Sequence, residues 1–106
     1  MKRIKRRYLA LQIEMETAPT EREFIDAIWA AVGKLYGEVG ASTTGLALIS
    51  FDGERKLAVV RVWLASLPIV RASLASMVSV AGKGAAIHVL CVSGTLKALR
   101  NSEKCL

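Results

Sequence analysis

The large hydrophobic residues near the start of the chain alternate with smaller or polar ones. From Tyr8 to Met15, every second residue is a large aliphatic one or methionine, and the residues between them include a glutamine and a glutamate. A period of two places the aliphatic side chains on one face of an extended chain. The segment is therefore predicted to be a β-strand with one buried face.

A helical pattern follows the first strand. Thr20 and Glu23 have the spacing of a capping box, in which the Thr20 hydroxyl accepts a hydrogen bond from the Glu23 amide and the Glu23 carboxylate accepts one from the Thr20 amide. Large apolar residues then recur every three or four positions over Phe24–Leu35, which is typical of an amphipathic helix. We expect Gly37 and Gly40 to end this helix.

Two apolar runs in the middle of the chain, Gly45–Phe51 and Leu57–Leu64, are separated by a short polar turn and predict a β-hairpin. In the second run, Arg61 and Trp63 share one face. The pair is compatible with a stacking and phosphate-binding platform for RNA. It is equally compatible with an arginine whose aliphatic stem covers a tryptophan on a partly covered sheet face.

A second helix is predicted from Pro68 to about Ala81, followed by a strand over Ile87–Val92. Ser93-Gly94-Thr95 then caps a short basic helix, Leu96 to about Ser102. The outward positions of the second helix are small and nearly uncharged, unlike those of a solvated helix, so we expect this face to pack against a protein partner. The predicted partner-binding residues are Ala72, Ala75, Ser76 and Ser79.

The order β-α-β-β-α-β, with an added C-terminal helix, predicts an α+β fold. It is typical of the ferredoxin-like, RNA-recognition-module-like sandwich with a four-stranded antiparallel sheet. We expect a basic N-terminal arm over residues 1–7, a ferredoxin-like domain over 8–93, and a C-terminal helix and tail over 94–106. RNA-binding modules, small-molecule-sensing domains and small phosphatases share this fold, so the fold alone does not select a function.

The net charge of +6 is concentrated at the two ends of the chain. Five of the first seven residues are Lys or Arg, the segment from Lys97 onward adds +2, and the residues between carry −1. Basic ends on a nearly neutral body are typical of contact with a phosphate backbone or an anionic lipid. Since 53% of the 106 residues are hydrophobic, the chain is too small to bury all of them, which indicates an apolar surface for a protein partner.

Neither export nor membrane insertion is indicated by the apolar segments. The apolar stretch after the basic start ends at Glu14, so it is too short for a signal peptide. The stretch Ala72–Leu96 is long enough to span a bilayer, but it has Gly82-Lys83-Gly84 at its centre, where a charge is most costly. We therefore expect a cytoplasmic protein with no membrane contact.

Residue types that carry out catalysis are sparse. His88 is the only histidine, and Cys91 and Cys105 do not form a Cys-x-x-Cys motif. The segment after the first strand, Met15–Pro19, has no arginine for the phosphate-binding loop of an acylphosphatase-like enzyme. We expect no catalytic residue, no metal site and no cofactor bound by the chain itself.

Five segments in order carry a resemblance to a known family. They are Arg7-Tyr8-Leu9-Ala10, Leu35-Tyr36-Gly37-Glu38-Val39-Gly40-Ala41, Gly45-Leu46-Ala47-Leu48-Ile49, Val60-Arg61-Val62 and Val92-Ser93-Gly94-Thr95-Leu96-Lys97-Ala98-Leu99. The last segment is the most specific, and the similarity runs from about Arg7 to Arg100. The chain resembles the archaeal ribonuclease P protein component 2 family.

The resemblance implies an RNA-binding subunit of ribonuclease P, the ribonucleoprotein endonuclease (a hydrolase) that removes the 5′ leader from precursor tRNA. In that family the RNA and its magnesium ions perform the hydrolysis, so this chain would be a non-catalytic subunit. The implied partners are the ribonuclease P RNA, the TIM-barrel protein component 3 and, indirectly, precursor tRNA. A homodimer within a heterotetramer is a further expectation.

The basic ends and the strand platform supply the predicted RNA-binding residues. They are Lys2, Arg3, Lys5, Arg6, Arg7, Arg61, Ser93, Thr95, Lys97 and Arg100. Ser93 and Thr95 are included because the helix that they open offers N-terminal amides to a phosphate, although an ordinary N-cap is the alternative. A different class of function stays open, a small-molecule-sensing regulatory domain that acts as a dimer; it would account for the apolar surplus but not for the basic ends.

Overall fold

The computed structural model describes residues 5–42 and 44–100, without the side chains of 38–42 and 100. The elements are β1 (Arg6–Glu14), α1 (Glu21–Ser42), β2 (Ala47–Asp52), β3 (Leu57–Trp63), a 3₁₀ turn (Leu64–Ser66), α2 (Leu67–Ser76), β4 (Ser79–Val80), β5 (Lys83–Gly84), β6 (Ala86–Ser93) and α3 (Leu96–Arg100). None of the helices in the described ranges is both long enough and apolar enough to cross a lipid bilayer.

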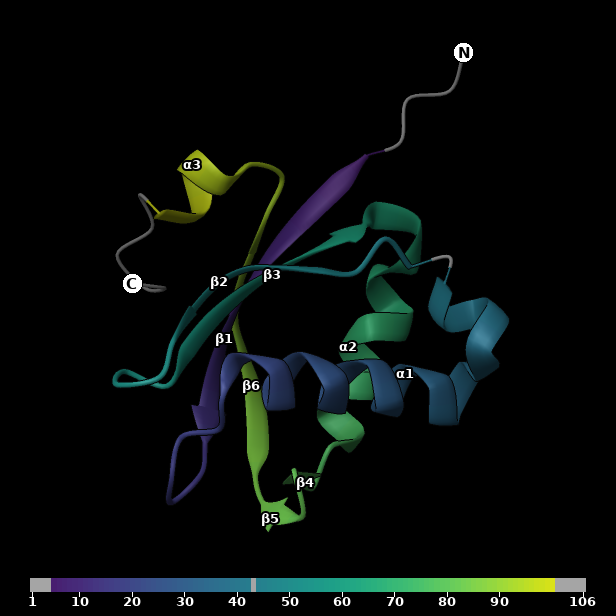
Figure 1. Cartoon of the computed structure of the whole chain (residues 1–106). Coiled ribbons are helices and arrows are strands. Elements are labelled where there is room, and N and C mark those ends of the chain that lie inside the picture. The colour runs from purple at the N-terminus through teal and green to yellow at the C-terminus, as the bar shows by residue number, and fades with distance from the viewer. Residues whose placement is uncertain (1–4, 43, 101–106) are drawn as a thin grey trace.

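Four of the strands form one antiparallel sheet in the order β2-β3-β1-β6. The first and last main strands therefore lie next to each other, and Tyr8 pairs with Ser93. This order, with α1 and α2 as the connections between strands, is the ferredoxin-like arrangement that the element order predicts (Figure 1). The predicted fold class is confirmed.

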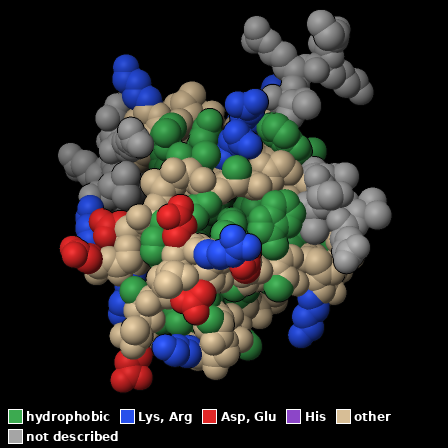
Figure 2. Space-filling view, viewed as in Figure 1, with side chains coloured by type: hydrophobic (Ala, Val, Ile, Leu, Met, Phe, Trp, Pro, Cys, Tyr) green, Lys and Arg blue, Asp and Glu red, His purple; other side chains and the backbone are tan. Residues whose placement is uncertain are grey.

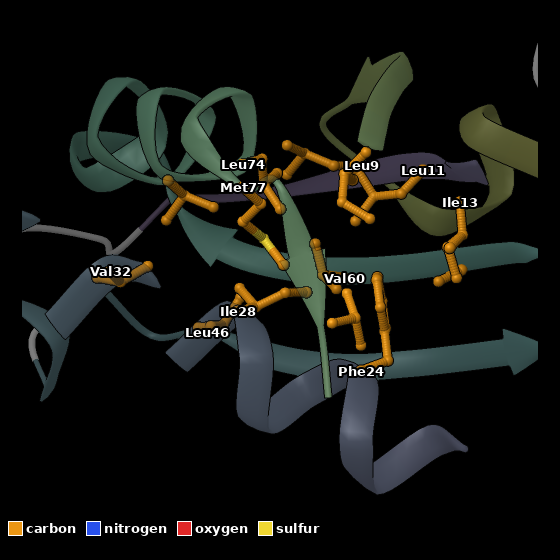
Figure 3. Close-up of a cluster of buried hydrophobic side chains, with 14 of the residues drawn as sticks. Leu9, Leu11, Ile13, Phe24, Ile28, Val32, Leu46, Val60, Leu74 and Met77 are labelled. Carbon is orange, nitrogen blue, oxygen red and sulfur yellow. The ribbon is translucent and has the colours of Figure 1, made fainter. Parts of the chain in front are cut away.

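One face of the sheet, the inner face, packs against α1 and α2. Its alternating aliphatic residues and the apolar stripes of the two helices form one cluster, seen in Figure 3. Among its fully buried members are Leu9, Leu11, Ile13, Phe24, Ile28, Val32, Val60, Val62, Val70 and Leu74. Full burial of such a side chain contributes about 1.5–3 kcal/mol, so the inner face supplies most of the hydrophobic stabilisation.

The opposite face of the sheet, the outer face, is only partly covered. The short helix α3 packs there, and its Leu99 forms a small buried cluster with Ala10 and Val59. Leu99 is only 1% exposed. The C-terminal helix therefore covers the side of the sheet that faces away from α1 and α2, a choice that the sequence pattern left open.

The start of α1 confirms the predicted capping box. The Thr20 amide donates to the Glu23 carboxylate at 2.9 Å, and the Glu23 amide donates to the Thr20 hydroxyl at 3.1 Å. The prediction that the helix ends at its glycines is wrong. Gly37 breaks the helical geometry (φ 76°, ψ 169°), but helical turns resume and continue to Ser42.

The end of α2 also differs from the prediction. The helix stops at Ser76 instead of about Ala81, because Met77 is extended (φ −69°, ψ 128°) and the chain forms the small β4–β5 hairpin. The turn has positive φ at Ala81 and at Gly82 (52° and 80°). This hairpin buries Val80 to 1% exposure in the core cluster, which a continued helix would not reach in the same way.

Candidate nucleic-acid interface

The last residues of the predicted N-terminal arm belong to the sheet. Lys5 accepts a hydrogen bond at its carbonyl from the Leu64 amide at 2.8 Å, and β1 begins at Arg6, two residues before the predicted strand. Main-chain pairing, not hydrophobic alternation, sets this start. The predicted contacts Lys2 and Arg3 lie outside the described residues.

Arg6 and Arg7 point to opposite faces of the sheet because they are consecutive in a strand. Arg6 pairs with Trp63 in register and shares the outer face with it. The Arg7 guanidinium lies beside the chain at the end of β6, where a Cβ added to Gly94 would be 3.4 Å from one of its nitrogens. Arg7 therefore connects the N-terminal basic segment to the start of α3.

Arg61 and Trp63 lie on the outer face of β3, as predicted. The guanidinium carbon of Arg61 is 5.6 Å from the centroid of the Trp63 ring, and that of Arg6 is 5.5 Å from it. Both distances are within the roughly 6 Å range of cation–π attraction. Arg6, which the sequence did not link to the tryptophan, joins the pair only through the register of β1 and β3.

The Ser93–Thr95 segment forms an N-cap in the structure. The Thr95 hydroxyl accepts a hydrogen bond from the Ala98 amide at 3.1 Å, and the Ser93 hydroxyl accepts one from the Thr95 amide at 3.4 Å. Of the two readings, the ordinary cap is therefore the one that these atoms make. Lys97 is exposed in the first turn of α3, and Arg100 is the last residue of α3.

Basic residues from distant parts of the sequence meet at one end of the sheet. The start of β1, the end of β3 and the end of β6 share this end because both neighbours of β1 are antiparallel to it. We call its side chains, with the adjoining α3 lysine, the basic end. They are Lys5, Arg6, Arg7, Arg61 and Lys97.

The acidic side chains that the structure describes lie toward the opposite end of the sheet. There β1 and β2 end and α1 begins. They are Glu14, Glu16, Glu21, Glu23, Asp26, Asp52 and Glu54. In the view of Figure 2, the red acidic side chains likewise lie at the left and below, and the upper rim shows blue side chains without red ones. The molecule therefore has an electrostatic polarity along its strands.

Several acidic groups at that end have local partners. The Glu14 carboxylate is 2.7 Å from Nε2 of His88, with both side chains more than half exposed. Asp52 accepts a hydrogen bond from the Arg55 amide at 3.2 Å. Hydrogen bonds from the Thr20 amide and hydroxyl, followed by the charge of Lys83, hold the pKa of Glu23 below its usual value of 4.5. These contacts account for local structure and turn geometry.

The described residues bring together no set of three or more His, Cys, Asp or Glu side chains that could bind a metal ion. Cys91 is disulfide-bonded, so it offers no thiolate as a nucleophile or ligand.

The predicted protein-contact face is exposed, but it spans two elements. Ala72, Ala75 and Ser76 lie on the surface of α2, whereas Ser79 lies in β4 because the helix ends earlier than predicted. Beside them is a groove of about 380 Å³ between α1 and the segment that follows α2. Its apolar lining includes Ala27, Ala30, Ala31, Leu35, Met77 and Val78.

The sequence pattern missed this groove. It placed Val78 on the buried stripe of a longer helix, but Val78 is 78% exposed. The two positive-φ residues that follow it, Ala81 and Gly82, bring the chain back toward the sheet. The glycine at position 82 was the available signal of a turn so close to the helix.

Comparison with known proteins adds relatives over nearly the whole chain. The Rpp14/Pop5 family profile matches residues 7–103. Ribonuclease P protein component 2 of Methanosarcina mazei is 31% identical over 104 residues, covering 98% of this chain and 86% of the relative. The proteins of the same name from Pyrococcus furiosus and Archaeoglobus fulgidus are 34% identical (92% of this chain, 82% of the relative) and 37% identical (90% and 84%).

A chain in the cryo-EM structure of yeast ribonuclease MRP has the same fold. Its TM-score is 0.73 at 18% identity, covering 90% of this chain and 78% of the yeast chain. The family match, the archaeal relatives and the ferredoxin-like sheet agree with the resemblance seen in the sequence. This chain belongs to the Rpp14/Pop5 family.

Proposed function

We propose that this chain is the RNA-binding protein subunit of a ribonuclease P and supports the RNA-catalysed removal of the 5′ leader from precursor tRNA. The observation that carries the proposal is the basic end, which gathers Lys5, Arg6, Arg7, Arg61 and Lys97 with no described carboxylate among them. A surface of this kind attracts a phosphate backbone and releases its counterions. The family membership supports the same assignment.

The role that we propose is positioning. Clustered Lys and Arg side chains neutralise phosphates and let the RNA fold tightly enough to hold its own metal ions. The chain contributes cations and hydrogen-bond donors at the basic end, while its carboxylates lie toward the other end of the sheet. We therefore propose that the magnesium ions belong to the RNA and that the chain supplies no group to the hydrolysis.

The protein-contact side of the proposal uses a different surface. We propose that the TIM-barrel protein component 3 docks on the exposed residues of α2 and that a second copy of this chain completes a heterotetramer. The small side chains of Ala72 and Ala75 allow close approach of another backbone, and the neighbouring groove is lined mainly by apolar side chains. The sensing alternative is not favoured, because it leaves the polarity of the charges without a role.

Reconstitution tests the proposal most directly. The chain and its barrel partner are added to ribonuclease P RNA, and cleavage of precursor tRNA is measured at limiting magnesium. We expect the two proteins to lower the magnesium concentration that the RNA needs, because they replace part of its counterion atmosphere. Equal cleavage with and without this chain would remove the proposal. The cytoplasm, as the place of this reaction, is part of the same proposal.

The N-terminal segment needs a charge substitution and not a deletion. Removing residues 1–7 would take away the start of β1, since Arg6 and Arg7 pair with Trp63 and Val62. Replacing Lys2, Arg3 and Lys5 with alanine keeps the strand. We expect weaker RNA binding and a flatter salt dependence, by about 0.7–0.9 unit of log–log slope for each lost phosphate contact. An unchanged slope would show that these three cations do not contact RNA.

A single substitution separates docking from folding. Ala75→Arg places a long charged side chain on the exposed face of α2. We expect the variant to unfold within about 0.5 kcal/mol of the wild type, as exposed substitutions usually do, and to lose assembly with component 3. Gel filtration of the mixture and urea denaturation of the chain measure the two quantities. Full assembly of a folded variant would place the partner elsewhere.

A further inference from the structure

We propose that Arg6, Arg61 and Trp63 form a clamp for a phosphodiester group of RNA, in which the tryptophan orients two arginines and does not stack on a base. The inference rests on the proposed RNA-binding function and assigns a site and a mode of contact within it. It also decides between the two readings of Arg61 and Trp63 that the sequence left open.

The geometry of the clamp comes from two neighbouring strands. Arg6 lies directly opposite Trp63, and Arg61 lies two residues before Trp63 on the same face of β3. Their guanidinium carbons are 5.5 Å and 5.6 Å from the centroid of the same indole ring. One ring therefore holds two cations that would otherwise repel each other.

The indole ring is itself fixed in place. The Trp63 amide donates to the Thr44 carbonyl at 2.9 Å. Gly45 lies against the ring, since a Cβ added there would be 2.2 Å from Cε2 and 2.4 Å from Nε1. Gly45 also has a positive φ of 67°, which suits glycine. With Gly45 and two guanidinium groups around it, the ring has little free face to offer a base.

The arginines have unused hydrogen-bonding capacity. The Nε atom of Arg61 is buried and has no hydrogen-bond partner in the described structure. Its neighbours across the sheet, Tyr8 and Ala47, carry no negative charge, and neither ion pair found among the described residues involves Arg6 or Arg61. Two planar guanidinium groups that lack a carboxylate are suited to the bidentate recognition of a phosphate.

The surroundings favour RNA over an isolated anion. Lys5 precedes the clamp directly, and Arg7 continues the positive charge toward the start of α3. A nucleic-acid backbone presents a phosphate at every nucleotide, so one strand can satisfy the clamp and the adjoining cations together. A single free phosphate would leave most of these cations without a partner.

The test uses the fluorescence of Trp63 in the full chain. The chain has two tryptophans, so Trp29→Phe leaves Trp63 as the only one. Ribonuclease P RNA and, separately, inorganic phosphate are titrated into this variant. We expect the RNA to change the emission of Trp63 as it draws the two guanidinium groups away from the ring, and inorganic phosphate to have little effect at the same phosphate concentration.

Affinity measurements test the arginines. In the double variant Arg6→Ala/Arg61→Ala, we expect RNA affinity at 0.15 M salt to fall about fivefold per arginine and the log–log salt slope to fall by about 0.7–0.9 per arginine. Arg71→Ala is the matched control, because Arg71 is an exposed arginine on α2, away from the outer face. We expect it to change both quantities much less.

A charge-neutral variant and a conservative one test the geometry. Trp63→Leu keeps both charges and removes the ring, and Arg61→Lys keeps the charge and removes the planar fork; we expect each to bind RNA a few-fold more weakly. Circular dichroism and urea denaturation confirm that each variant is folded, and a variant with a shifted unfolding midpoint is compared below its own transition.

Each outcome bears on a different claim. If the wild-type chain binds no RNA, the proposed function fails and the clamp fails with it. If the wild type binds RNA but the double variant keeps the same affinity and slope, only the clamp is overturned. The clamp is also overturned if Arg71→Ala causes an equal loss, or if inorganic phosphate reproduces the full change in emission.

Discussion

The two faces of the sheet use the same strands for different purposes. On β3, Val60 and Val62 are fully buried on the inner face, whereas Arg61 and Trp63 on the outer face are only partly buried. The inner face is closed by two helices, and the outer face carries one helix of five residues. The comparison teaches that alternate residues of one strand can be assigned to stability and to binding, because a pleated strand separates them by face.

The largest expected effect breaks the inner face. Phe24 is fully buried and packs against Phe51, with ring centroids 5.7 Å apart. We expect Phe24→Ala to lower the free energy of unfolding by about 3–5 kcal/mol, because it removes a buried ring and leaves a cavity. Urea denaturation followed by circular dichroism measures the change. A loss below 1 kcal/mol would show that the inner face is not the main source of stability.

A smaller effect is expected on the outer face. Leu99 is buried against Ala10 and Val59, but it belongs to a short helix that covers only part of the sheet. We expect Leu99→Ala to cost about 2 kcal/mol, at the low end for a buried leucine, because the site can relax toward solvent. Hydrogen exchange should show faster opening of α3 and unchanged protection in β1. A cost equal to that of Phe24→Ala would contradict the distinction between the faces.

The smallest effect concerns the start of α1, away from both faces. We expect Thr20→Ala to cost about 1 kcal/mol, since it removes the hydroxyl that accepts from the Glu23 amide. A change in circular-dichroism unfolding midpoint measures it. The matched control is Thr17→Ala, a threonine that precedes the helix and has no capping bond among those described. Equal effects would remove the capping bond from the account.

The same cap predicts a pH dependence. The pKa of Glu23 is lowered in the folded state, so its ionised form stabilises the fold above the usual value of 4.5. This contribution is lost as the pH falls through the lowered pKa. We therefore expect Glu23→Ala to be more destabilising at pH 7 than at pH 3, with denaturation curves at both values as the measurement. A larger effect at pH 3 would reverse the sign and refute the assignment.

Local sequence patterns predicted the elements where one interaction dominates. Alternation over Tyr8–Met15, the Thr20–Glu23 spacing and the Ser93–Thr95 cap each gave the observed structure to within a few residues. Prediction was poorer where tertiary packing competes with local preference. The early end of α2 and the start of β1 at Arg6 follow from the burial of Val80 and from main-chain pairing with β3, neither of which shows in a local pattern.

The candidate site was predictable residue by residue but not as a constellation. Arg6 and Arg61 were both expected to contact RNA, yet nothing in the sequence links positions 55 residues apart to one indole ring. The role of Gly45 as the surface on which that ring rests was likewise missed. Its only sequence signal is a glycine at the predicted start of a strand.

The sequence by itself determined the order of the elements, the face on which each strand residue lies and the concentration of charge at the chain ends, because periodicity and composition are local properties. The tertiary structure alone decided that those ends meet. Antiparallel pairing of β1 with both β3 and β6 brings the start of the first strand beside the ends of the other two. That juxtaposition places Arg6, Arg7 and Arg61 at one end of the sheet, and the carboxylates that the structure describes toward the other.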